Sequence, residues 1–218
     1  MARAFEALYG SPWHHPGAAW IGGLLVLIAI VRARAELRWL LVLLELEIVV
    51  DALFTGAFSP VAPNSMASTL LSVLFVILGD LRFFYVLGRQ RLERARALPL
   101  ALGAALVVPV LTQIARRTSP DFFAEPRHTF LFYELAFVLV ALVTLGVVRR
   151  TFAPGPIRRW LLLLTGFEVV QYGLWVLADV VILAGADAGF GLRLVPNLMY
   201  YVAFVPFVFA TAPGEARA

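Results

Sequence analysis

Long apolar stretches recur along this chain and are separated by short loops that hold most of its charge. A helix needs about 20 apolar residues to cross a hydrocarbon layer roughly 30 Å thick. The 218 residues are 61% hydrophobic and 15% charged, which is more apolar than a water-soluble domain of this size can bury. The sequence therefore predicts an all-α, polytopic membrane protein with seven transmembrane helices. The predicted spans are 17–32, 38–58, 67–88, 97–115, 129–148, 158–184 and 192–211.

Basic residues are distributed unevenly between the two ends of the predicted helices. All 18 of them are arginine, because the chain has no lysine. They crowd the loops within 32–38, 89–96 and 149–159, whereas the loop 59–65 has none. Since positively charged loops stay in the cytoplasm, we expect the N-terminus outside and the C-terminus in the cytoplasm. The net charge of +4 follows from this topology and from anionic headgroups. We therefore expect a multi-pass protein of a bacterial-type inner membrane, with no nucleic-acid partner.

Two segments of the chain repeat each other. Residues 38–58 and 159–179 align without gaps, with nine identities in 21 positions that include an Arg-Trp start and one acid, Glu47 and Glu168. We interpret this as a parallel 3+1+3 repeat inside a single membrane domain that spans residues 1–218. The two halves, about 12–90 and 128–212, would share one orientation, with 97–115 as the linker helix.

Carboxylates inside the predicted spans are the main functional signal, because an ionisable group at membrane depth costs about 3 kcal/mol or more. Glu47 and Asp51 are four residues apart and share a helical face, whereas Glu45 points nearly the opposite way. A rise of about 1.5 Å per residue places Glu47, Asp80 and Glu168 at a similar depth. Neighbouring carboxyls in an apolar medium cannot all ionise, so one is expected to act as a general acid. The predicted catalytic acids are Glu47, Asp80, Glu168 and Asp51.

Aromatic and polar side chains accompany these acids. Tyr172 and Trp175 lie on the same helical stripe as Glu168, and Asn197 and Tyr201 share a face on the last span. The residues predicted to bind a substrate are Tyr172, Trp175, Asn197, Tyr200, Tyr201, Phe84, Phe204 and Arg82. Arg82 is also expected to neutralise either Glu45 or Asp51 in an ion pair.

Several other polar and aromatic residues have a structural explanation. Asp179 and Arg193 are expected to form an interfacial ion pair, and Glu134 is either a site residue or an interfacial one. Trp13, Trp20, Trp39 and Trp160 are typical of an interfacial aromatic belt, which leaves Trp175 as the one deep indole. His14, His15 and His128 fall on the outer side and are more typical of an interface than of a metal site. With no cysteine in the chain, thiolate ligands and disulfides are excluded, and we predict no metal and no cofactor.

Three short motifs resemble those of the small integral membrane terpene cyclases of meroterpenoid pathways. They are Leu46-Glu47-Ile-Val-Val with Ser59-Pro60, then Leu78-Gly79-Asp80-Leu81, and Asn197-Leu-Met-Tyr200-Tyr201. The resemblance implies a seven-helix enzyme in which a buried acid, here matched by Glu47, protonates an epoxide or alkene of a prenylated lipid. Ring closure would then follow along aromatic walls. The chain departs from the family's pattern at Leu46, where the family has tryptophan, and at Asn197, where an aspartate is expected.

Two other classes remain open. The 3+1+3 plan is similar to that of the SWEET and PQ-loop carriers, which implies a proton-coupled small-solute carrier, although the Pro-Gln dipeptide is missing. Gly79-Asp80 and Ala178-Asp179 resemble the acid-bearing helices of the lysoplasmalogenases, which implies a lipid hydrolase. A retinal protein is excluded, because no lysine is present to form the Schiff base. We expect an enzyme whose partner is a membrane lipid or a prenylated small molecule.

Overall fold

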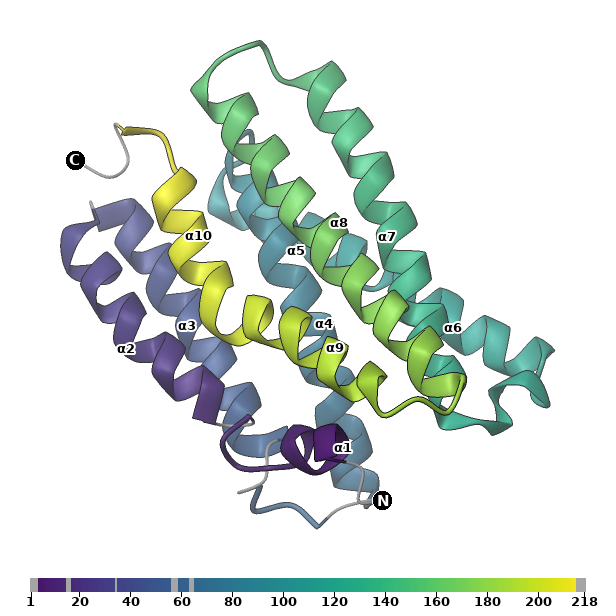
Figure 1. Ribbon diagram of the computed structural model, residues 1–218. Helices are drawn as coiled ribbons and strands as arrows, with labels where there is room; N and C mark the ends of the chain where they lie inside the picture. The colour runs from purple at the N-terminus through teal and green to yellow at the C-terminus, as the bar shows by residue number, and fades with distance from the viewer. Residues whose placement is uncertain (1–3, 15–16, 34, 56–58, 63–64, 215–218) are drawn as a thin grey trace.

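The protein is built from helices throughout the part of the chain that the computed structural model describes, residues 4–14, 17–33, 35–55, 59–62 and 65–214 (Figure 1). The elements are α1 Ala4–Tyr9, α2 Gly17–Arg32, α3 Ala35–Thr55, α4 Met66–Arg89, α5 Arg94–Ala105, α6 Val107–Thr118, the 3₁₀ turn η1 Phe122–Ala124, α7 Pro126–Thr151, α8 Pro156–Leu183, α9 Ala188–Leu198, the π-helix η2 Met199–Ala203 and α10 Phe204–Thr211. The prediction of an all-α protein is confirmed.

Four continuous helical segments are long and apolar enough to cross a membrane. Within the described residues they are Arg94–Thr118, Pro126–Thr151, Pro156–Leu183 and Ala188–Thr211. These segments support a membrane protein. The other three predicted spans also fall on helices, namely α2, α3 and α4, but the count of seven spans stays a prediction.

Consecutive long helices run in alternating directions (Figure 1). The helices α7 and α8 form a long hairpin, and α9, η2 and α10 lie between this hairpin and the pair α2 and α3. The loops that join α2 to α3, α4 to α5 and α7 to α8 lie at one end of the bundle together with the C-terminal end of α10, whereas α1 lies at the opposite end. The arginine-rich loops therefore share one end of the molecule.

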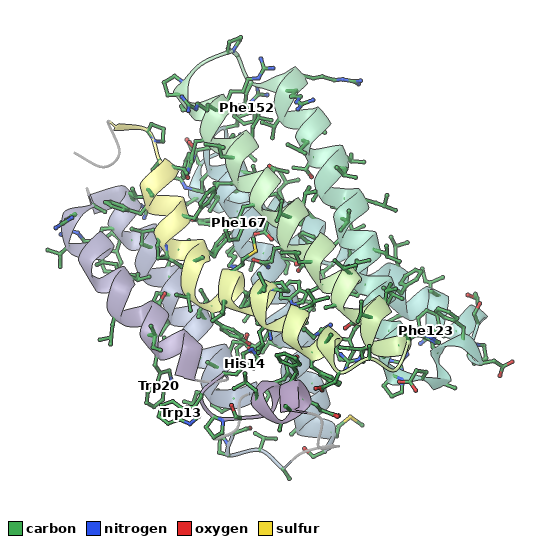
Figure 2. The ribbon with its side chains drawn as sticks, in the orientation of Figure 1. Trp13, His14, Trp20, Phe123, Phe152 and Phe167 are labelled. Atoms are coloured by element: carbon green, nitrogen blue, oxygen red, sulfur yellow. The ribbon has the colours of Figure 1, made fainter. Side chains whose placement is uncertain are left out.

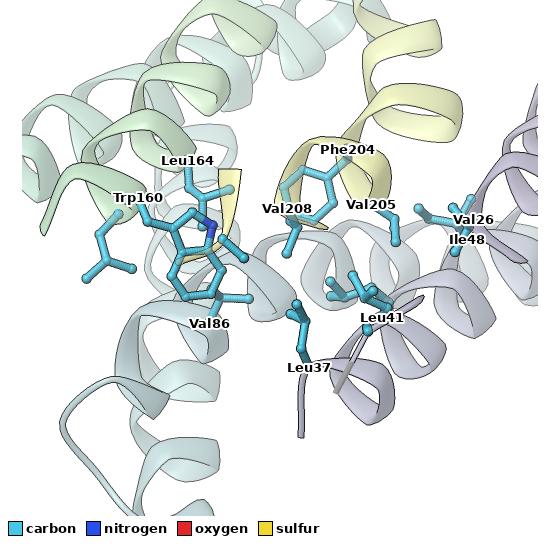
Figure 3. Close-up of a cluster of buried hydrophobic side chains, with 14 of the residues drawn as sticks. Val26, Leu37, Leu41, Ile48, Val86, Trp160, Leu164, Phe204, Val205 and Val208 are labelled. Atoms are coloured by element: carbon cyan, nitrogen blue, oxygen red, sulfur yellow. The ribbon is translucent and has the colours of Figure 1, made fainter. Parts of the chain in front are cut away.

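The largest apolar core lies between α2, α3, α8 and α10 (Figure 3). Leu41 and Ile48 of α3 meet Val205 and Val208 of α10, and all four are buried. Trp160 also belongs to this core and is only 4% exposed, so its predicted place in an interfacial belt is wrong. The reason is that Trp160 lies on the face of α8 that packs toward the core.

The other three tryptophans of the predicted belt are exposed. Trp13, Trp20 and Trp39 are 84%, 55% and 63% exposed, and Figure 2 shows Trp13 and Trp20 on the outside of the bundle near α1. Trp39 and Trp160 occupy equivalent positions in the two repeated segments, yet one is exposed and the other is buried. The repeated Arg-Trp start therefore does not give the two indoles the same environment.

The last predicted span contains a π-helix that separates α9 from α10. Pro206 has no N–H to donate to the carbonyl of Val202, which favours an irregular turn at this level. Gly22 of α2 lies against this turn, and a Cβ at that position would lie 2.3 Å from the carbonyl oxygen of Tyr201. Glycine therefore allows α2 to approach the backbone of η2 closely. Such π-turns are frequent at functional sites, and both Tyr200 and Tyr201 belong to this one.

Candidate functional site: a buried cluster of acids, tyrosines and arginine

Arg82 of α4 is the cation at the centre of the bundle. Its Nη1 donates to Oε2 of Glu47 on α3 at 3.0 Å. The guanidinium lies 4.0 Å from the ring centroid of Tyr200 and 4.2 Å from that of Phe204. Only 5% of Arg82 is exposed. The ion pair therefore forms with Glu47, and the prediction that Arg82 would neutralise Glu45 or Asp51 is wrong.

Two consecutive tyrosines of η2 bind two acids of α3. The hydroxyl of Tyr200 donates to Oε1 of Glu47 at 3.0 Å, and the hydroxyl of Tyr201 donates to Oδ2 of Asp51 at 3.3 Å. The two acids are one turn apart, so they present their carboxylates to the same neighbouring helix, as their spacing indicates. Both oxygens of Glu47 are therefore bound, one by Arg82 and the other by Tyr200.

Asp80 of α4 is the most deeply buried acid of this group, with 1% of the residue exposed. The hydroxyl of Tyr172 on α8 donates to its Oδ1 at 2.7 Å, and the hydroxyl of Tyr133 on α7 donates to its Oδ2. Tyr172 is one of the residues predicted for the site, whereas Tyr133 is not. A tyrosine in an apolar helix has no spacing signal of its own, and only the packing of α7 beside α8 brings it to Asp80.

Glu168 of α8 lies near both charged groups of α4. It is 3% exposed and interacts electrostatically with Arg82 and with Asp80. Three of the predicted catalytic acids, Glu47, Asp80 and Glu168, therefore lie around one arginine. Asp51 joins the same group through Tyr201. We call these residues, with Tyr133, Tyr172, Tyr200 and Arg82, the central cluster.

Aromatic rings line the side of the central cluster that contains Asp80. The ring of Phe137 stacks on Tyr172, with centroids 4.0 Å apart, and Phe84 lies 6.1 Å from Phe137. Trp175 meets Tyr172 edge to face at 4.9 Å and lies 6.2 Å from Tyr200. The aromatic residues predicted for the site are thus brought together. Phe137 completes the group and was missed by the sequence analysis.

Asn197 connects this aromatic group to the N-terminal part of the chain. Its Oδ1 accepts from Nε1 of Trp175 at 2.6 Å, and its Nδ2 lies 3.1 Å from Nε2 of His14. His14 is only 7% exposed. His14 is therefore buried where the first described residues fold back over the bundle, and its predicted depth at a membrane interface stays a prediction. His15 lies outside the described residues.

Glu45 is a further buried acid of α3. It is 9% exposed, and it interacts electrostatically with Arg82 and Glu47. Within the described part of the chain, neither of its carboxyl oxygens has a hydrogen-bond partner. The buried surface of α3 is wide enough to include both Glu45 and Asp51. It is therefore wider than the single helical stripe that contains Glu47 and Asp51.

A second ionic group, which we call the outer cluster, joins α7, α8 and α9 nearer the end that contains α1. Arg193 contacts Glu134 at 3.1 Å and also pairs with Asp179, which in turn contacts Arg127 at 3.3 Å. Asp179 is 0% exposed and Arg193 is 8% exposed. The predicted ion pair between Asp179 and Arg193 forms, but this pair is buried inside the protein. Glu134 belongs to the same cluster.

Two surface hollows lie away from both clusters. Two hollows of about 350 and 590 Å³ are found near the start of α8, lined by residues that include Gly155, Arg159 and Leu163. None of the acids of the central cluster lines either hollow. Among the described residues, no group of three or more histidines, cysteines and acids is arranged to hold a metal ion.

Comparisons with known proteins found nothing similar to this chain. No protein-family model, no curated protein and no solved structure matches it. A function therefore has to be inferred from the contacts of its own buried residues.

Proposed function

We propose that this protein is an integral membrane enzyme that protonates an isoprenoid-like lipid with a buried carboxylic acid and thereby cyclises or isomerises it. The observation that supports this proposal is the setting of Asp80. Its carboxyl group is almost fully buried, both of its oxygens bind tyrosine hydroxyls, and the surrounding side chains are aromatic. An acid in such a setting is shielded from water and oriented toward a fixed position.

The reaction needs a proton and no oxidant or reductant. The acid gives its proton to an epoxide oxygen or an alkene carbon, and in the first case the C–O bond breaks and leaves a carbocation. The π electrons of a neighbouring alkene then form a new C–C bond, and the final cation returns a proton to the carboxylate. The product of this sequence is an isomer of the substrate, with the same mass.

The neighbours of Asp80 suit a cationic intermediate. Aromatic faces attract cations, and Phe84, Phe137, Tyr172 and Trp175 form a connected group of rings beside the acid. A water-poor site is needed, because water would add to the cation and end the reaction.

The other acids of the central cluster have different roles in this proposal. Glu47 is the residue that resembles the catalytic acid of the membrane terpene cyclases in sequence. Its carboxylate, however, is already balanced by Arg82 and bound by Tyr200. We assign Glu47, Asp51 and Arg82 to positioning of η2 and of the substrate. Glu168 is the nearest candidate to exchange protons with Asp80, since the two interact electrostatically.

The proposal is tested by mass spectrometry of lipids from membranes that contain the protein, supplied with prenylated quinols or epoxy-isoprenoids. The wild type is expected to produce a compound of unchanged mass and altered retention. Asp80→Asn should abolish this product, and Tyr133→Phe and Tyr172→Phe should each reduce its formation. Tyr85→Phe, on the same helix, is the matched control and should retain activity. Full activity of folded Asp80→Asn would overturn the assignment of the proton donor.

A proton-coupled carrier is the second candidate, favoured by the broken last helix. Pro196 and Pro206 flank the π-helix η2, and interrupted helices beside buried charges are typical of transporter binding sites. The chain has no cysteine, so single cysteines introduced on either side of the central cluster can be labelled cleanly. Labelling that changes reciprocally on the two sides when a solute is added would favour the carrier. A hydrolase of lysoplasmalogenase type is not favoured, because Asp80 and Asp179 contact different partners.

A further inference from the structure

The N-terminal segment, residues 4–14, lies over the end of the bundle that contains the outer cluster (Figure 1). None of the residues of α1 is buried, so little apolar burial holds this helix in place. The carboxylate of Asp187 instead accepts from the backbone N–H groups of Phe5 and Glu6, each at 3.0 Å. Because these donors belong to the first turn of α1, Asp187 caps α1 from another part of the chain.

Tyr9 adds a second polar contact between the N-terminal segment and the bundle. Its hydroxyl accepts from Nε of Arg193 at 3.2 Å, and its ring lies 5.8 Å from that of Phe190. Arg193 is the central cation of the outer cluster. The N-terminal segment is therefore connected to the buried ion pairs of α7, α8 and α9.

His14 forms the third contact, and its hydrogen bonds identify which ring nitrogen holds the proton. The Nδ1 atom lies 2.8 Å from the backbone carbonyl oxygen of Tyr9, and a carbonyl oxygen can only accept. Nδ1 must therefore bear the hydrogen, which leaves Nε2 of the neutral ring as an acceptor. Figure 2 places His14 at the junction between α1 and the rest of the bundle.

The side-chain amide of Asn197 has its orientation set in the same way. The indole Nε1 of Trp175 can only donate, so the atom that receives its hydrogen bond is Oδ1 of Asn197. The amide nitrogen of Asn197 then faces Nε2 of His14 and donates to it at 3.1 Å. In this series of hydrogen bonds, each donor meets an acceptor only while His14 is neutral.

We propose that the N-terminal segment is a proton-sensitive lid that His14 holds closed when neutral and releases when protonated. Protonation places a hydrogen on Nε2, which then faces the NH₂ group of Asn197, and two donors cannot bond to each other. Asn197 could accept this hydrogen only by rotating its amide, which would break its bond to Trp175. His14 of the lid contacts Asn197, which accepts from Trp175, and Trp175 packs on Tyr172, the partner of Asp80. This inference does not depend on the reaction proposed above.

The surroundings of His14 set the direction of the pH dependence. Burial lowers the pKa of His14 below 6.5, and the bond to the Tyr9 carbonyl opposes this only in part. The titratable and charged groups nearby are Tyr9 and Glu6 of α1, Arg193 of α9, Asp187 before it, and Tyr201 of η2, which interacts with Tyr9.

The lowered pKa of His14 determines in which direction pH shifts the equilibrium between the closed and the open lid. Above pH 6.5 the ring is neutral whether the lid is closed or open, and the closed state keeps its full stability. Below that pH the open state binds a proton more readily. The equilibrium should then shift toward the open lid by about tenfold for each pH unit, until the ring protonates in the closed state as well.

Distances between two spin labels test the lid in the intact, purified chain. The protein has no cysteine, so Ala7→Cys on α1 and Arg117→Cys on α6, both at exposed positions, are the only labelled sites. The wild-type background should show a narrow distance distribution at about pH 8 and a broader, longer one at about pH 5, the range in which histidine titrates. His14→Gln cannot gain a charge, so it should keep the narrow distribution at both pH values. His14→Lys, which is charged at both, should show the broad one.

His128 provides the matched control. Its Nδ1 also bonds a backbone carbonyl oxygen, that of Phe122 at 2.6 Å, but His128 lies in the first turn of α7 and its ring stacks on Phe122 of η1. His128→Gln should therefore respond to pH as the wild type does. A wild-type distribution that is the same at both pH values would overturn the proposal. So would a full pH response in His14→Gln, because the proton sensor would then be another group.

Discussion

At the scale of single residues, Arg82 controls the charge balance of the central cluster. It is buried with Glu47 and stacks on two aromatic rings. Buried charges are tolerated only when they are paired, and removal of one partner leaves the other uncompensated. Lysine cannot replace this arginine, because it lacks the planar group that bonds to the carboxylate while stacking on Tyr200 and Phe204.

Arg82→Met is expected to destabilise the protein by about 3–5 kcal/mol, because Glu47 is left buried without a cation. The double variant Arg82→Met with Glu47→Gln should recover most of this loss. Thermal or denaturant unfolding in detergent measures both changes. If the double variant is as unstable as Arg82→Met alone, the two residues are not coupled as their ion pair indicates.

At the scale of secondary structure, the contact between α2 and η2 determines where the two tyrosines of the π-helix lie. Gly22 allows the backbones to approach closely, and Tyr200 and Tyr201 then reach Glu47 and Asp51. Any side chain at position 22 must push α2 and η2 apart, because the atom that it meets is a backbone oxygen.

Gly22→Ala is therefore expected to destabilise the protein by about 1–3 kcal/mol, in spite of the higher helix propensity of alanine. Gly173→Ala on α8 is the matched control, because a Cβ there meets no atom within 4 Å. That control should change stability by no more than about 1 kcal/mol and in the stabilising direction. Unfolding measured in the same detergent compares the two. Equal effects would mean that the approach of α2 to η2 is not tight.

At the scale of the whole molecule, the alternating helices separate two chemically different ends. The arginine-rich loops lie at one end, and the exposed tryptophans Trp13 and Trp20 lie near the other (Figures 1 and 2). The orientation of these two ends relative to a membrane stays a prediction from the arginine distribution. The number of spans depends on whether α2, α3 and α4 cross the membrane as well.

Single cysteines at exposed positions on either side of α4 test this prediction. In a seven-span protein, Ala62→Cys should react with a membrane-impermeant maleimide added outside intact cells, whereas Glu93→Cys should react only after permeabilisation. If α4 does not cross, the two positions lie on the same side and label alike. The wild type, which lacks cysteine, is the background control.

The helical class, the approximate positions of the helices and three acids of the central cluster could be predicted from the sequence alone. Runs of apolar residues and the clusters of arginine between them are local properties of the sequence, so they do not depend on how the helices are arranged. Glu47, Asp80 and Glu168 were selected for the same reason, because a carboxylate inside an apolar helix is unusual wherever that helix packs.

The partners of these acids were decided only by the tertiary structure. Arg82 pairs with Glu47 and not with Glu45, and Trp160 lies in the core and not at the membrane interface. Tyr133 binds Asp80 and His14 contacts Asn197, although no local pattern indicated either contact. Contacts between helices depend on how each helix is rotated about its axis and how far it is shifted along it. Hydropathy does not specify either quantity. The sequence by itself therefore determined which helices contain acids at depth, and the packing determined which faces of those helices are buried and what the acids bind.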